Sequence, residues 1–112
     1  MNEPTPITID EFARVDLRVG TILTAAPHPN ADRLLVLSVN LGEPVPRQLV
    51  AGIRASYDPA SLVGRQIVVV ANLKPAVLRG AESQGMLLAA SDGEGISVLA
   101  PGRRFAPGTK VR

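Results

Sequence analysis

The stretch Asn72-Leu-Lys-Pro-Ala-Val-Leu-Arg-Gly-Ala-Glu-Ser-Gln-Gly-Met-Leu-Leu88 connects two apolar runs, Ile67–Val70 and Met86–Ala90. We interpret these two runs as core strands. A proline and two glycines interrupt the stretch, so it cannot form one continuous helix or strand. A polar, positively charged loop that core strands fix at both ends is a common form of binding surface. A solvated hairpin connection is the alternative interpretation.

The composition predicts a single all-β domain. The chain has 112 residues, enough for one hydrophobic core, and 46% of them are hydrophobic. Because Phe12, Tyr57 and Phe105 are the only aromatic residues, Val, Leu, Ile and Ala must build the core, and the β-branched residues among them favour strands. Ten glycines and ten prolines spread along the chain indicate many turns.

The net charge is only +2, but it is unevenly distributed. Residues 1–60 carry five arginines and seven acidic residues, which gives −2. Residues 61–112 carry seven cations and three acidic residues, which gives +4. This polarity suggests that one side of the protein faces an anion.

The residue types that catalysis and metal binding require are scarce. The chain has no cysteine, which excludes a disulfide scaffold and a thiolate metal site. His28 is the single histidine, and we interpret it as a turn residue, with a ligand or general-base role as the alternative. We interpret Asp92-Gly-Glu-Gly as a turn and not as an acid/base pair. The sequence therefore predicts no enzyme activity, no cofactor and no metal.

The sequence also predicts a cytoplasmic protein that does not cross a membrane. The N-terminus is acidic and contains prolines, without the basic and apolar regions of a secretory signal. No apolar run approaches the roughly 20 residues that span a bilayer.

Local patterns predict the first third of the chain. Residues 1–6 are a lead-in, and Thr8-Ile-Asp-Glu11 matches a capping box that starts a short helix, with Phe12 as its anchor to the core. Alternation from Val15 predicts a first strand that ends at Pro27, with a bulge at Gly20.

The following elements are also predicted from local patterns. Asn30 is expected to cap a single helical turn over residues 31–33. Asp58, followed by proline, predicts a second short helix that ends at Gly64. The further predicted strands are Leu35–Leu41, Gln48–Ile53, Arg65–Leu73 and Gly85–Ala90, followed by a shorter one over Ile96–Leu99.

The order of three strands, a short helix and two strands matches a five-stranded oligonucleotide/oligosaccharide-binding (OB) barrel. The ligand face of that fold comprises strands two and three with the first and fourth connections. We expect one domain over residues 1–112, with the barrel over about residues 14–91 and a C-terminal β extension over about residues 92–112. The connections His28–Arg33 and Asn72–Leu88 would then flank one face.

The charged connections favour RNA binding over catalysis. Cations that can bind phosphates are Arg33, Arg47, Lys74 and Arg79. Amide and hydroxyl groups that can contact 2′-hydroxyls or base edges are those of Asn72, Ser83 and Gln84. Sequence-tolerant single-strand binders stack bases on several aromatic side chains, which this chain lacks. For any one arginine, a solvated surface charge is the alternative.

Four segments, in order and spacing, resemble the tRNA-binding domain family. They are Asp10-Glu-Phe-Ala-Arg-Val-Asp-Leu-Arg-Val-Gly20, His28-Pro-Asn-Ala-Asp-Arg-Leu34, Val70-Ala-Asn-Leu-Lys-Pro75 and Arg79-Gly-Ala-Glu-Ser-Gln-Gly-Met86. The resemblance covers residues 7–112. The family includes free-standing tRNA-binding proteins and the C-terminal domain of many bacterial methionyl-tRNA synthetases.

The resemblance implies an OB fold with a C-terminal extension that commonly forms a homodimer, and structure-specific tRNA binding without catalysis. It also implies an aminoacyl-tRNA synthetase as a candidate partner. Carried over by position, the tRNA-binding residues are Asn30, Arg33, Asn72, Lys74, Arg79, Ser83 and Met86, to which we add Gln84. A related branch resembles an export-related chaperone, so a chaperone-like dimer that binds unfolded polypeptides is the alternative function.

The apolar runs independently predict a dimer. A barrel strand with one solvent face should alternate, whereas Ile67–Val70 and Met86–Ala90 are continuously apolar. The C-terminal segment can cover part of these strands, and a second copy would cover the rest. The predicted interface residues are Ile96, Val98, Leu99, Phe105 and Val111. In the alternative, the N-terminal helix and the C-terminal segment together cover both strands in a monomer.

Overall fold

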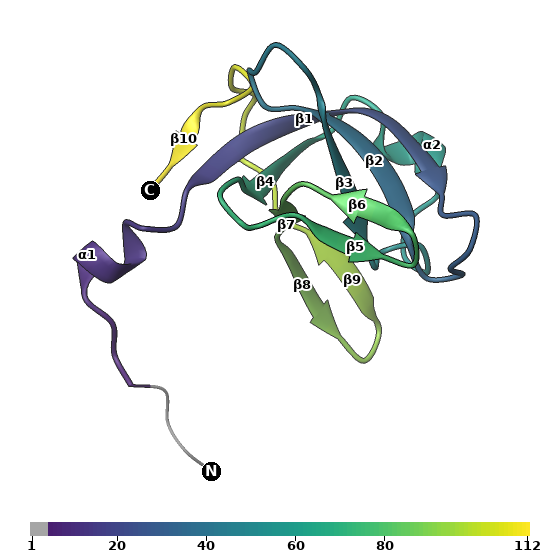
Figure 1. Cartoon of the computed structure of the whole chain (residues 1–112), viewed down its shortest axis with the longest axis horizontal. Coiled ribbons are helices and arrows are strands. Elements are labelled where there is room, and N and C mark those ends of the chain that lie inside the picture. Colours follow the sequence, from purple (N-terminus) through teal and green to yellow (C-terminus); the bar gives the residue numbers. More distant parts are fainter. Residues whose placement is uncertain (1–4) are drawn as a thin grey trace.

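The computed structural model describes residues 5–112 and consists of a curved antiparallel sheet, two short helices and two hairpins (Figure 1). Its elements are α1 (Ile9–Phe12), β1 (Leu17–Pro27), β2 (Leu35–Asn40), β3 (Arg47–Ala51), α2 (Pro59–Leu62), β4 (Gln66–Val70), β5 (Ala76–Leu78), β6 (Ala81–Ser83), β7 (Met86–Leu87), β8 (Ala89–Asp92), β9 (Gly95–Val98) and β10 (Lys110–Val111). Part of the predicted lead-in, residues 1–4, lies outside the described residues.

The main sheet has the order β3-β2-β1-β4-β7, and β10 pairs with the start of β1. The sheet curls until β3 meets the chain between β6 and β7. There the N–H of Gln84 donates to the carbonyl of Gln48 at 2.8 Å, and the N–H of Val50 donates to the hydroxyl of Ser83 at 2.9 Å. The prediction of an all-β, five-stranded OB barrel with short helices is confirmed.

The core of the barrel follows from strict alternation along β2. Leu35, Leu37 and Val39 are fully buried, and the residues between them are half-buried because they lie on the outer face. β1 pairs with β2 on one side and β4 on the other, so its long twisted strand links both halves of the sheet. Helix α2 begins at Pro59 with Asp58 as its N-cap, as predicted, and contributes the buried Leu62 to the same core.

The bulge predicted at Gly20 is wrong. Gly20 pairs in register with Ile67 of β4, and the register of β1 shifts instead between Ile22 and Thr24. Gly20 is a glycine because the core leaves no room for a side chain there. A Cβ at this position would lie 2.7 Å from Cγ1 of Val39.

We expect Gly20→Ala to destabilise the protein, because its methyl group would overlap buried side chains of β2. Overpacking of this kind costs about 1–3 kcal/mol of unfolding free energy, measurable as a lower urea midpoint. Gly93→Ala is the matched control, because a Cβ at Gly93 meets nothing within 4 Å. Equal midpoints for the two variants would contradict the packing role of Gly20.

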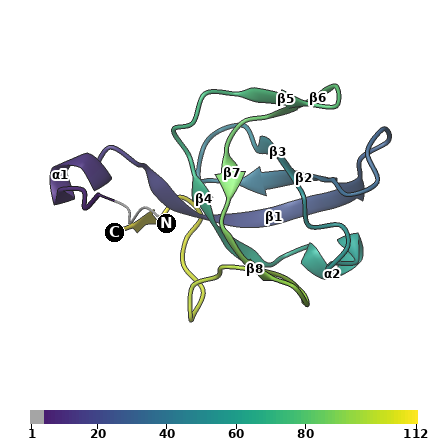
Figure 2. The ribbon, with the colours of Figure 1, turned by 90° about the horizontal axis from the view of Figure 1, so that it is seen from below.

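Helix α1 has its predicted capping box but lacks the predicted anchor. The N–H of Glu11 donates to the hydroxyl of Thr8 at 3.1 Å, and the Glu11 carboxylate accepts from the N–H of Thr8 at 3.2 Å. Phe12 is 39% exposed and Ile9 is 77% exposed, so the prediction that Phe12 is buried is wrong for the single chain. The helix stands away from the barrel (Figures 1 and 2), which leaves its apolar side uncovered.

The predicted fifth strand Gly85–Ala90 is divided between two sheets. β7 pairs with β4, whereas β8 turns outward and pairs with β9 in a separate hairpin. Leu87 is the last residue of the run that reaches the core, and Ala89 and Ala90 are exposed. No helix among residues 5–112 is long and apolar enough to cross a membrane.

The five predicted interface residues occupy different environments in the C-terminal extension. Ile96 and Val98 pack against the barrel core of their own chain, and Val111 lies in β10, paired with β1. Phe105 is half-buried, whereas Leu99 is exposed. The role of these residues in a dimer stays a prediction.

Candidate functional site

The fourth connection forms a hairpin, β5–β6, that projects from one side of the barrel (Figure 2). The first connection, His28–Arg33, is bonded to this hairpin near its tip. We call the surface made by residues 28–33 and 72–86 the hairpin face. The prediction that the two charged connections flank one face agrees with this arrangement.

His28 links the two connections. Its side chain is 4% exposed, and its Nε2 lies 3.0 Å from the carbonyl oxygen of Leu78 in β5. Its Nδ1 accepts the N–H of Asn30 at 2.9 Å. A neutral imidazole with its proton on Nε2 satisfies both bonds. The predicted helical turn over residues 31–33 is reduced to a single turn, in which the N–H of Leu34 donates to the carbonyl of Ala31 at 3.4 Å, and no helix forms in this loop.

The tip of the hairpin is a two-residue turn with an unusual first residue. Arg79 has φ of 54° and Gly80 has φ of 91°, and positive φ at both positions is typical of a type I′ turn. Asparagine, aspartate and glycine are the usual residues at the first position, because other side chains are strained there. Arg79 is the one non-glycine residue with positive φ among residues 5–112. Its side chain is therefore held at the tip against the local backbone preference.

Three predicted cations of the hairpin face are exposed and have no acidic partner. The two ion pairs within residues 5–112 join Arg18 to Asp16 and Arg47 to Glu43. The remaining cations on this face are Arg33, Lys74 and Arg79. The polar Asn30 and the 48% exposed Met86 complete the accessible part of the predicted set.

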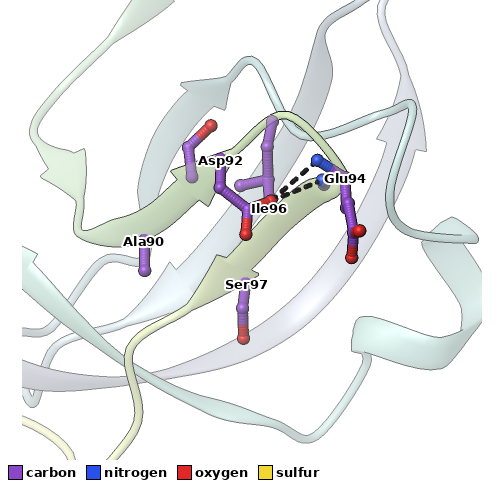
Figure 3. A pocket seen from close by; sticks show the side chains of 7 residues that line it. Ala90, Asp92, Glu94, Ile96 and Ser97 are labelled. Carbon is purple, nitrogen blue, oxygen red and sulfur yellow. Dashed lines mark hydrogen bonds between the residues drawn. The ribbon is translucent and has the colours of Figure 1, made fainter.

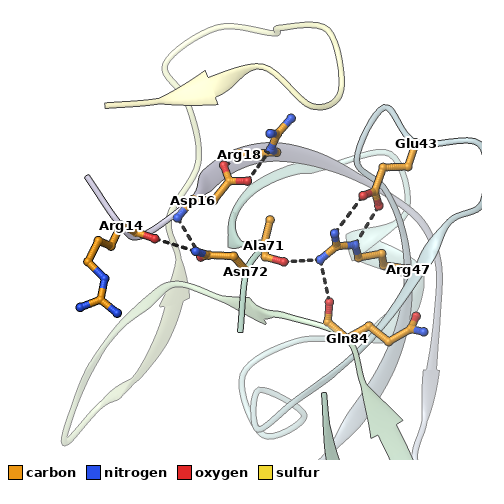
Figure 4. A network of polar contacts seen from close by, with 8 residues as sticks. All are labelled: Arg14, Asp16, Arg18, Glu43, Arg47, Ala71, Asn72 and Gln84. Atoms are coloured by element: carbon orange, nitrogen blue, oxygen red, sulfur yellow. Dashed lines mark hydrogen bonds and ion pairs between the residues drawn. The ribbon is translucent and has the colours of Figure 1, made fainter. Parts of the chain in front are cut away.

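Arg47 is a structural residue in this fold. Its guanidinium donates to both carboxylate oxygens of Glu43, at 2.8 and 2.9 Å, and to the carbonyl oxygens of Ala71 and Gln84 (Figure 4). The hydrogen bonds that Glu43 accepts from Arg47 lower the pKa of Glu43 below its usual value. The Arg47–Glu43 ion pair therefore persists at neutral pH and is lost as the carboxylate becomes protonated in acid. The guanidinium joins the β2–β3 connection to both ends of the hairpin segment. Glu43, four residues earlier, was the sequence signal for this pairing.

Ser83 and Gln84 use their polar groups to close the barrel. The Ser83 side chain is 5% exposed, and its hydroxyl accepts from Val50 and donates to the carbonyl of Gly85 at 2.8 Å. The Gln84 side-chain carbonyl accepts the N–H of Gln48 at 2.9 Å. Both residues therefore fix the base of the hairpin to β3.

Asn72 holds the start of the same connection. Its side-chain oxygen accepts the N–H of Asp16 at 2.8 Å, and its side-chain nitrogen donates to the carbonyl of Arg14 at 2.6 Å (Figure 4). The amide thus ties the end of β4 to the chain that enters β1. The structure brings Asn30 and Arg79 to the tip of the hairpin face, whereas Asn72, Ser83 and Gln84 lie at its base.

The segment Asp92–Gly95 forms a turn between β8 and β9, as predicted, and the side chain of Asp92 stabilises it. One carboxylate oxygen of Asp92 accepts the N–H groups of Glu94 and Gly95 at 2.8 and 3.1 Å (Figure 3). The same turn lines a shallow hollow that contains no histidine. Within residues 5–112 there is no group of three His, Cys, Asp or Glu side chains that could hold a metal ion.

We expect His28→Ala to lower the unfolding free energy by about 1–3 kcal/mol, because it leaves two backbone groups without partners. His28→Asn should cost less, because an asparagine side chain can accept the N–H two residues on, but it is too short to reach Leu78. Chemical denaturation measures both values, and amide exchange at Asn30 should accelerate only in His28→Ala. Unchanged stability in His28→Ala would contradict the link between the connections.

The fold and the hairpin face define a class of protein, a small OB-type binding module with a cationic surface. A family model described as a putative tRNA-binding domain matches residues 17–110. The chain belongs to this tRNA-binding domain family.

The chain is also similar to a longer synthetase and to two solved structures. Methionine–tRNA ligase of Thermococcus kodakarensis is 53% identical over 106 residues, which are 95% of this chain but 14% of that protein. The chain therefore spans about one seventh of the length of that curated relative. A methionyl-tRNA synthetase-related protein of Pyrococcus horikoshii has a TM-score of 0.89 at 30% identity, over 97% of this chain and 100% of that one. The chaperone CsaA of Bacillus anthracis has a TM-score of 0.87 at 29% identity, over 96% and 100%.

Proposed function

We propose that the chain is a non-catalytic module that binds folded tRNA through the hairpin face, in the cytoplasm, as a homodimer or within a synthetase assembly. The observation that carries the proposal is the placement of Arg79. Arg79 occupies a strained turn position and is exposed at the tip of a projecting hairpin, so its side chain does not stabilise the fold there. Strained, exposed residues of this kind are typical of ligand-binding sites. The relationship to methionine–tRNA ligase supports tRNA as that ligand.

The predicted site residues divide into two roles. Direct contacts to RNA come from side chains that are exposed and free of acidic partners: Asn30, Arg33, Lys74, Arg79 and Met86. The other three predicted residues act by holding the connection in place, because the Asn72 amide, the Ser83 hydroxyl and the side-chain carbonyl of Gln84 are already bonded within the protein.

The type of RNA follows from the side chains available on the hairpin face. Arginine and lysine bind phosphates, and asparagine bonds to hydroxyls and base edges. The three aromatic residues of the chain, Phe12, Tyr57 and Phe105, lie outside residues 28–33 and 72–86, so this face has no stacking platform for single strands. Recognition of a folded RNA by its shape and backbone is the mode that such a surface supports.

We expect Arg79→Asn to weaken tRNA binding by about 1–3 kcal/mol, the range for a lost charged hydrogen bond. Because asparagine tolerates positive φ better than arginine, the melting temperature should stay unchanged or rise slightly. Fluorescence titration with tRNA and thermal unfolding measure the two effects. Arg112→Asn, which removes one exposed cation outside the hairpin face, is the control. Undiminished affinity in Arg79→Asn would contradict the proposal.

The dimer part of the proposal rests on apolar surface that one chain leaves uncovered. The N-terminal segment exposes Ile7, Ile9 and Phe12, and α1 buries none of its residues. On the barrel, an apolar hollow is lined by residues that include Val68 and Phe105. In a two-fold dimer, the N-terminal segment of each copy can pack into the apolar hollow of the other copy, so that both surfaces are buried twice. Two hairpin faces would then act on one large ligand.

We expect sedimentation equilibrium at micromolar concentration to give about twice 11.8 kDa for the chain. Ile9→Asp should shift the mass toward the monomer, because it places a charge on the uncovered apolar surface. Val63→Asp is the matched control, since Val63 is also exposed but lies after α2. A mass near 11.8 kDa for the unchanged chain would rule out the dimer.

Binding of unfolded polypeptides is the second candidate function, and one observation favours it. Val45 and Leu73 are exposed and line one hollow beside the hairpin, and Val77 is exposed on β5. Such apolar side chains suit a polypeptide better than an RNA, and the similarity to CsaA points the same way. Parallel titrations with folded tRNA and with an unfolded polypeptide separate the two. Tight polypeptide binding together with no salt-sensitive tRNA binding would establish this alternative.

A further inference from the structure

A second cationic surface lies away from the hairpin face. It is a hollow between the start of β4 and the segment that follows β9, and its cations are Arg65, Arg103 and Arg104. Tyr57 forms another part of its lining, and no acidic residue takes part. Its lining comes from residues on either side of α2 and from β9, which pairs with β8, and Figure 2 shows α2 and β8 at the opposite edge of the barrel from β5 and β6. We call the surface made by these three arginines and Tyr57 the arginine groove.

Two of the arginines are held by contacts within the protein. The guanidinium of Arg103 lies 4.1 Å from the ring centroid of Phe105, a distance typical of a cation–π interaction. The guanidinium of Arg104 donates to the carbonyl of Gly64 at 3.0 Å. Side chains that are already ordered lose less entropy when a ligand binds.

The segment that carries these arginines is itself fixed to the barrel. The buried Gln66 accepts the N–H of Phe105 at 2.9 Å and donates to its carbonyl at 2.6 Å. On the other side of the groove, the guanidinium of Arg65 lies 5.5 Å from the centroid of Tyr57, whose hydroxyl accepts the N–H of Val98. The backbone on both sides of the groove is therefore hydrogen-bonded to side chains of the barrel and its flanking segment.

Three like charges gathered without an acidic partner repel one another and favour an anion between them. Neither ion pair found in residues 5–112 involves these arginines. A guanidinium group can donate two parallel hydrogen bonds to two oxygens of one phosphate group, so phosphate is the anion that fits these arginines best. Charge and geometry together point to a phosphate-binding surface.

We propose that the arginine groove binds a second stretch of the phosphodiester backbone of the RNA that the hairpin face binds. This inference rests on the proposed function. The protein measures 40 × 39 × 28 Å and the two surfaces lie at opposite edges of its barrel, so a ligand that touches both must reach across the barrel. That requirement selects a large folded RNA over a short strand.

The test is the salt dependence of tRNA affinity in charge variants. Each phosphate contact that is lost lowers the slope of log affinity against log salt concentration by about 1. We expect Arg103→Gln to lower the slope by about 1, and Arg65→Gln with Arg103→Gln together by about 2. Arg112→Gln removes the same charge outside the groove and should leave the slope unchanged. Melting temperatures confirm that each variant is folded.

Three results of the tRNA and sedimentation measurements would overturn the inference. If the groove variants keep the wild-type slope while Arg79→Asn weakens binding, the groove takes no part and the proposed function stands. If the unchanged chain binds no tRNA, the proposed function and this inference fail together. If the groove variants change the sedimentation mass, the groove belongs to a protein interface.

Inorganic phosphate distinguishes a free anion from an RNA backbone. The side-chain N–H signals of Arg65 and Arg103 can be followed by NMR during a phosphate titration. We expect weak shifts that do not saturate at millimolar phosphate, because a single phosphate lacks the neighbours that a backbone supplies. Saturation at low millimolar phosphate with an unchanged tRNA salt slope in Arg103→Gln would assign the groove to a free anion and overturn the inference.

Discussion

Closure of the barrel between β3 and the chain around Ser83 is the constraint on which the remaining structure depends. The hydroxyl of Ser83 and both the backbone and the side chain of Gln84 bond to β3, where a fifth regular pairing of barrel strands would otherwise be needed. The β5–β6 hairpin begins and ends next to this closure. The bonds that complete the core therefore also set the direction in which the hairpin projects. A loop anchored in this way can present charges without first having to be ordered.

The arginines illustrate how one residue type serves structure and binding in the same small protein. Arg47 has its charge neutralised by Glu43 and its remaining N–H groups bonded to carbonyl oxygens, so it joins segments of the fold. Arg79 is exposed in a backbone conformation that costs on the order of 1 kcal/mol or more, and no acidic residue pairs with it. The difference lies in the neighbours and not in the side chain.

The sequence predicted the features that depend on local patterns. Alternation located β2, and the proline after Asp58 located α2. Predictions failed where a contact joins distant residues. Phe12 is apolar and follows a capping box, yet it lies outside the barrel core and stays 39% exposed. The glycine at position 20 is required by side chains of another strand, which leave no room for a Cβ. The burial of His28 depends on its hydrogen bond to the carbonyl of a residue 50 positions away. Such pairings arise from the three-dimensional fold, and no local period encodes them.

The central claim is that the hairpin face is the RNA-binding surface. Backbone amide NMR signals of the labelled protein, recorded while folded tRNA is added, test it most directly. The account predicts that the largest shifts or losses of signal fall in residues 28–33 and 72–86, including Arg79. Signals of these two segments that stay unchanged while the rest of the protein responds would contradict it.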